Sequence, residues 1–181
     1  MNEHEAWQIK GDSPLRHEFK NQEHEEALKG LRYHSAIVVE ERVFPPAVFA
    51  IAHDDKGHVA DLTKYDPDDW HAVVNDIVDK LKAKFVAVVC EGWAVGVHSP
   101  EEQERVWNRI EELGGVDKLP MDDRYEVIYI QYQEAGWDYT YTDQAIIDRA
   151  GAIRKCREWQ TGMPSTRKSW LQMPKADDKE L

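Results

Sequence analysis

The apolar and polar positions along the chain predict a mixture of strands and helices. Residues 85–90 (Phe-Val-Ala-Val-Val-Cys) form an unbroken apolar run, which is typical of a buried central strand. Shorter apolar or alternating segments predict four more strands at residues 47–53, 58–62, 124–133 and 138–149. A tight turn between residues 53 and 58 would join the first two into a hairpin.

Helical spacing of apolar residues predicts three helices, over residues 22–42, 66–84 and 100–113. The second helix begins with Asp66 followed by proline, and the third begins with Ser99 followed by proline. Both pairs place a capping side chain before a proline in the first turn. The glycines after residue 113 predict the end of the third helix.

The order of these elements favours an α+β (or α/β) fold. We expect a single two-layer domain at residues 22–150, with a mixed or mostly antiparallel sheet of about five strands and helices mainly on one face. Residues 1–21 are predicted to be a polar leader. Residues 151–181 are predicted to be a basic, Trp-containing tail, in which a helix reaches about residue 160 and a linker follows.

The net charge of −12 changes this picture because it is unevenly distributed. Residues 85–150 hold 14 acidic and 5 basic residues, whereas residues 151–181 hold 4 and 7. An acidic body repels phosphate backbones, so we expect no nucleic-acid binding except through residues 151–176 of the tail. Two cysteines, no signal-like segment and no apolar run of membrane length predict a cytoplasmic protein with no membrane partner.

Glu91 follows the apolar run and is the first candidate for chemistry. A carboxylate at the end of a buried strand needs a partner or a function. Arg124 on the next predicted strand offers a structural ion pair, and this is the favoured interpretation. The alternative is that Glu91, Asp123 and Glu126 converge to bind a divalent metal or to act as acid and base.

Histidine and cysteine provide weaker candidates. His53 and His58 flank the hairpin turn and could ligate a metal, but they lie in no recognised ligand motif, so solvated turn histidines are favoured. Cys90 is expected to be buried, and Cys156 lies among basic residues that would lower its pKa. No cofactor is predicted, because the chain lacks Walker A and Gly-x-Gly-x-x-Gly sequences.

The third predicted helix carries an exposed acidic face. Its glutamates are Glu101, Glu102, Glu104, Glu111 and Glu112. Such a face is usually only solvated, but it can also steer a basic protein partner. The basic tail can fold back onto this helix or contact another protein.

Four short motifs resemble a group of small bacterial and phage proteins of uncharacterised function. They are residues 44–49 (Phe-Pro-Pro-Ala-Val-Phe), 55–57 (Asp-Lys-Gly), 91–93 (Glu-Gly-Trp) and 123–127 (Asp-Arg-Tyr-Glu-Val). The resemblance covers roughly residues 28–149. It implies an accessory domain, cytosolic or phage-encoded, and brings no activity with it.

Together these observations predict a non-enzymatic interaction protein, phage or mobile-element encoded, that binds a protein partner through an acidic surface. It could act as an inhibitor or as a mimic of DNA. Two other functions stay open: a divalent-metal-dependent hydrolase or nuclease using the three carboxylates, and a self-assembling structural subunit.

Overall fold

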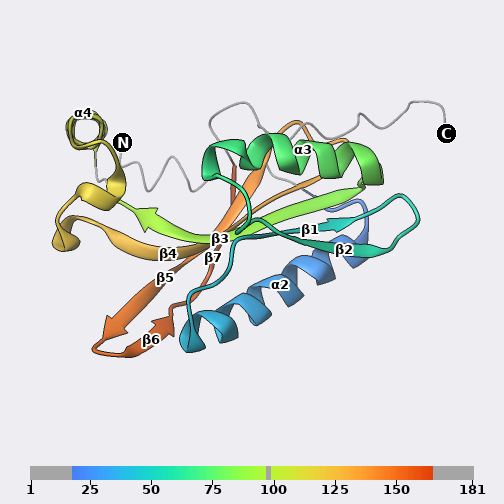
Figure 1. Cartoon of the computed structure of the whole chain (residues 1–181), viewed down its shortest axis with the longest axis horizontal. Helices are drawn as coiled ribbons and strands as arrows, with labels where there is room; N and C mark the ends of the chain where they lie inside the picture. Colours follow the sequence, from blue (N-terminus) through green and yellow to red (C-terminus); the bar gives the residue numbers. More distant parts are fainter. Residues whose placement is uncertain (1–17, 97–98, 165–181) are drawn as a thin grey trace.

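The computed structural model describes residues 18–96 and 99–164 (Figure 1). Within them, seven strands form one antiparallel sheet with the order β2-β1-β3-β4-β5-β6, and β7 pairs with β5. The strands are β1 (Ala47–Ile51), β2 (Gly57–Asp61), β3 (Phe85–Ala94), β4 (Tyr125–Glu134), β5 (Tyr141–Ala150), β6 (Ile153–Cys156) and β7 (Gln160–Pro164). The helices are α2 (Gln22–Glu41), α3 (Trp70–Leu81) and α4 (Pro100–Leu113), with short 3-10 turns η1 (Pro67–Asp69), η2 (Val116–Lys118) and η3 (Met121–Asp123).

Helices cover both faces of the sheet. Phe85, Ala87 and Val89 of β3 belong to the core beneath α2, whereas Val86 and Val88 belong to a second core beneath α3. Figure 1 shows α2 and α3 on opposite sides of the strands. The prediction of a mixed α+β fold is confirmed. The finer prediction of a two-layer domain with about five strands and helices mainly on one face is not confirmed.

The two cores explain the unbroken apolar run at the start of β3. Side chains alternate between the two faces of a strand, so a strand that is half exposed alternates apolar and polar residues. Residues 85–90 are all buried because α2 lies over one face and α3 over the other. The run was therefore a signal for helices on both sides, and not only for a central strand.

The capping signals in the sequence match the observed helix ends. The Asp66 side chain accepts a hydrogen bond from the amide of Asp68 ahead of α3, and the Ser99 hydroxyl accepts one from Glu102 at the start of α4. Gly114 ends α4 with a φ of 84°, a left-handed conformation that suits glycine. Within the described residues, no helix combines the length and apolar character needed to cross a bilayer.

The sheet continues beyond the predicted domain end at residue 150. Gly151, with a φ of 63°, turns the chain into β6. Ile147 is then paired with Cys156, and Tyr141 with Pro164, so β6 and β7 line the same edge of β5. The predicted helix reaching about residue 160 is wrong, and the predicted linker after it begins as β7. Residues 1–17 of the predicted leader and 165–181 of the predicted tail lie outside the described residues.

Candidate functional site

Glu91 joins three segments of the chain that are distant in sequence. Its Oε1 accepts a hydrogen bond from the backbone amide of Phe44, at 2.6 Å. Its Oε2 accepts one from Arg154 Nη2, at 2.5 Å, and the side chains of Glu91 and Arg154 are 10% and 8% exposed. The same Nη2 reaches Glu126 Oε1 at 3.2 Å. Glu91 thus ties β3 to the segment after α2 and to β6.

Arg124 is not the partner of Glu91, so the predicted ion pair is wrong. The Arg124 guanidinium lies over the Trp93 ring, 4.0 Å from its centroid. It also donates to the carbonyl of Asp117 and to the sulfur of Met121. The β5–β6 hairpin brings Arg154 to Glu91 instead. Arg154 is 63 residues from Glu91 in sequence, so proximity along the chain could not predict this pairing.

Glu126 is held by two arginines. Arg149 donates to its carboxylate through Nε and Nη2, at 2.5 and 2.6 Å. The hydrogen bond from Arg149, with the nearby positive charges of Arg149 and Arg154, lowers the pKa of Glu126 below its usual range despite partial burial. Two carboxylates and two guanidinium groups therefore form a balanced ionic cluster, which is typical of a structural role.

The structure does not assemble the residues that the sequence suggested as metal ligands. No group of three or more His, Cys, Asp or Glu side chains within residues 18–96 and 99–164 is arranged to hold a metal ion. Asp123 lies in η3, apart from the ionic cluster of Glu91 and Glu126. His53 is exposed with its Nδ1 3.2 Å from the Leu81 carbonyl oxygen, and His58 is exposed on β2.

Neither cysteine has the environment of an activated nucleophile. Burial raises the pKa of Cys90 to about 11, although a hydrogen bond with Tyr129 opposes this change. Burial also raises the pKa of Cys156, and the negative charge of Glu40 acts in the same direction. The basic neighbours of Cys156 in sequence therefore do not set its pKa, contrary to expectation.

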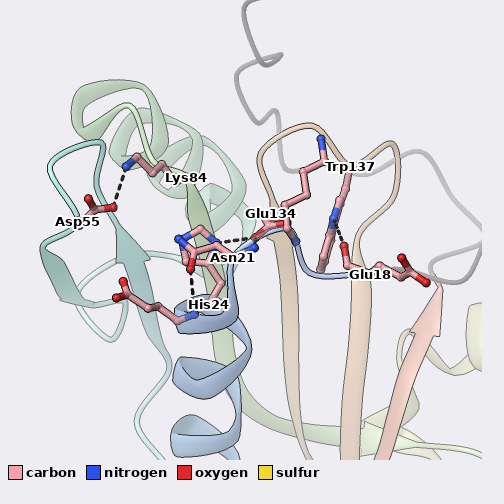
Figure 2. Close-up of polar contacts among 9 residues, drawn as sticks. Glu18, Asn21, His24, Asp55, Lys84, Glu134 and Trp137 are labelled. Carbon is pink, nitrogen blue, oxygen red and sulfur yellow. Dashed lines mark hydrogen bonds and ion pairs between the residues drawn. The ribbon is translucent and has the colours of Figure 1, made fainter. Parts of the chain in front are cut away.

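Two further buried carboxylates, which were not among the predicted site residues, hold α2 on the sheet. Glu134, at the end of β4, accepts a hydrogen bond from His24 Nδ1 at 2.6 Å and from the amides of Lys20 and Asn21 (Figure 2). Asp143 on β5 is fully buried and accepts bonds from Arg32 and Tyr132 and from the amide of Gly162.

One sequence signal does point to the first of these contacts. His24 and Leu28 are one helical turn apart, so they share the buried face of α2. That spacing indicates that His24 is a buried residue.

The predicted acidic face lies on a peripheral helix. Helix α4 packs mainly against η2 and makes no substantial contact with any strand of the described sheet. Figure 1 shows α4 at one end of the sheet, beyond the end of β3. At about 100° per residue, four of its glutamates project away from the apolar side of the helix. These four, here called the outer face, are Glu101, Glu104, Glu111 and Glu112, and all are exposed.

Glu102 lies outside the outer face, on the adjacent side of α4, where it lines an open cavity of about 520 Å³. Helix α4 also contributes Arg105, Val106 and Arg109 to this cavity. The facing wall comes from the segment that leads into β4. It consists of Leu119, Asp122, Asp123 and Tyr125, with Gly96 beside them. No sequence pattern predicted the cavity, because its two walls, α4 and η3, are separate along the chain.

Comparison with models of protein families, with curated proteins and with solved structures returns no match for this chain.

Proposed function

We propose that this chain is a non-enzymatic interaction protein that binds a basic protein partner through the outer face of α4. The observation that carries the proposal is the state of the four glutamates. They are exposed on one side of a peripheral helix, and none of them forms an ion pair within the described residues. The buried carboxylates, in contrast, are already bound to arginine, histidine or backbone amides.

Electrostatics supports the choice of a basic partner. The segment that contains α4 holds 14 acidic and 5 basic residues. Clustered charge of one sign accelerates the encounter with a partner of opposite sign and disfavours partners of like charge. A nucleic acid is therefore a poor partner for this surface, whereas a protein that itself binds nucleic acid is a good one. Inhibition by mimicry of DNA is the form of binding that this charge favours.

The proposed setting is the cytoplasm, or the host cytoplasm for a phage or mobile-element protein. Both cysteines are free thiols, which suits a reducing compartment. The two other functions considered from the sequence have no specific observation in their favour. Glu91 and Glu126 are occupied by Arg154 and Arg149, which weakens the proposal of metal-dependent hydrolysis.

Charge reversal on the outer face tests the proposal. The double variant Glu104→Lys/Glu111→Lys should lose capture of basic proteins from bacterial lysate, because it replaces attraction by repulsion. Its matched control is Glu41→Lys/Asp79→Lys, which makes the same change in net charge at exposed positions of α2 and α3. The measurement is quantitative mass spectrometry of the retained proteins at low and high salt.

The result expected is a set of basic proteins retained by the wild type and the control, lost from the outer-face variant, and released by salt. Retention of the same proteins by both variants would contradict the proposal. So would the absence of any salt-sensitive protein on the wild type. Circular dichroism of each variant establishes that the fold is unchanged.

A further inference from the structure

We propose that the cavity between α4 and η3 binds a segment of the partner that carries one acidic and one basic side chain. This inference rests on the proposed function, because the same partner would enter the cavity, which is lined by the side of α4 next to the outer face. It adds a second contact of different chemistry. The outer face attracts basic surfaces in general, whereas the cavity recognises a particular arrangement of opposite charges.

The α4 wall of the cavity presents two guanidinium groups. Arg105 and Arg109 are four residues apart, so their side chains emerge next to one another on the helix. Both are exposed, and neither forms an ion pair within the described residues. Two adjacent guanidinium groups provide several N–H donors in a planar arrangement that matches a carboxylate. This wall is therefore suited to the acidic side chain of a ligand.

The opposite wall has the reverse charge. Asp122 and Asp123 of η3 line the same cavity, are exposed, and form no ion pair in the part of the chain that the structure describes. The two guanidinium groups of α4, with the Glu102 carboxylate beside them, thus face two carboxylates of η3 with which they form no ion pair within the described residues. A ligand that carries a cation and an anion can pair with both walls at once. A ligand of a single charge would meet one attractive and one repulsive wall.

The wall opposite α4 also carries apolar side chains. Leu119 is buried at 4% exposure, whereas Tyr125 is 43% exposed and so retains surface for a ligand. Tyr125 packs closely on Gly96, where an added Cβ would lie 3.2 Å from ring atom Cε2. The ring is thereby held against the backbone. Its remaining surface suits the aliphatic part of a lysine or arginine side chain.

The size of the cavity is compatible with a short peptide segment. Its volume of about 520 Å³ lies within the range of roughly 300–1,000 Å³ that small-ligand sites occupy. The combination of opposed charges, an apolar strip and a partly exposed aromatic ring distinguishes this site from the solvated outer face.

Four blocked tetrapeptides test the inference directly. The mixed-charge probes are Lys-Ala-Ala-Glu and Glu-Ala-Ala-Lys, and the like-charge controls are Lys-Ala-Ala-Lys and Glu-Ala-Ala-Glu. The measurement is titration of the ¹⁵N-labelled full chain at millimolar peptide, followed through amide chemical shifts. At least one mixed-charge probe should shift amides of α4, η3 and Tyr125 in a saturable manner, and the like-charge controls should bind at least about tenfold more weakly.

A variant set separates this inference from the proposed function. Arg105→Gln/Arg109→Gln should weaken the mixed-charge probe at least about tenfold. Glu104→Lys/Glu111→Lys, on the outer face, should leave its binding within about twofold. Equal binding of all four peptides, or no saturable shift around the cavity, would overturn the inference. Loss of basic proteins from the outer-face variant would still support the proposed function in that case.

Discussion

At the scale of single residues, buried charge explains most of what holds the sheet to its neighbours. Glu91, Glu134 and Asp143 are all largely buried, and each accepts two or three hydrogen bonds from other segments. Burial of a lone carboxylate is costly, so the sequence could predict that Glu91 needs a partner. It could not predict which arginine, because the approach of Arg154 depends on the path of the β5–β6 hairpin.

Replacing Arg154 tests the corrected pairing. Arg154→Met should destabilise the protein by about 3–5 kcal/mol, because it leaves Glu91 buried without a cation. Arg124→Met is the matched control and should cost about 1 kcal/mol, since the contacts that it removes, with the Trp93 ring, the Asp117 carbonyl and the Met121 sulfur, leave no buried charge without a partner. Urea unfolding followed by tryptophan fluorescence measures both. A larger loss for Arg124→Met than for Arg154→Met would contradict this assignment.

At the scale of elements, local signals were sufficient where short-range chemistry decides the structure. The caps at Asp66, Ser99 and Gly114 marked helix ends correctly, and the turn after β1 was found from its residues. The signals failed for β6 and β7, which are defined by pairing with β5 rather than by their own pattern. In the same way, the acidic helix could be predicted from its own residues. The cavity could not, because it forms only where α4 and η3 come together in the fold.

Helix α4 should open more readily than the rest of the fold. It packs mainly against η2, and Trp107 and Leu113 are 45% and 43% exposed, so little apolar burial opposes local unfolding. Hydrogen exchange measured by mass spectrometry should show protection of α4 amides at least about tenfold lower than that of β3 and β4. Equal protection across these elements would show that α4 belongs to the same cooperative unit as the sheet.

At the scale of the whole molecule, α2, the sheet and α3 form three layers, with α4 outside them (Figure 1). The buried charged pairs His24–Glu134 and Arg32–Asp143 lie between α2 and the sheet, whereas the exposed glutamates of the outer face lie on α4. The part of the molecule that maintains the fold is therefore separate from the part proposed to bind partners. Charge changes on α4 can then alter binding without unfolding the protein.

Acid should destabilise the whole fold through Glu134. Burial opposes its ionisation, but the hydrogen bonds from His24 and from the amides of Lys20 and Asn21 outweigh burial and lower its pKa. Because the folded pKa is below the unfolded value of about 4.3, this stabilisation is fully present above that value. It is then lost as the pH falls through the folded pKa.

The measurement is the free energy of unfolding between about pH 7 and pH 2. Glu134→Gln should be less stable than the wild type at neutral pH and should show a shallower loss of stability in acid. Glu104→Gln, a substitution at an exposed and unpaired position, is the control and should keep the acid slope of the wild type. An unchanged slope in Glu134→Gln would contradict the role assigned to this carboxylate.

The contacts that hold α2 also set the order of events during synthesis. His24 and Arg32 bind residues that are 110 and 111 positions later in the chain. At about 5–20 residues per second, a ribosome needs roughly 5–20 s to add the residues between them. The apolar side of α2 therefore waits in the nascent chain until β4 and β5 have emerged, so the docking of this helix on the sheet comes late in synthesis.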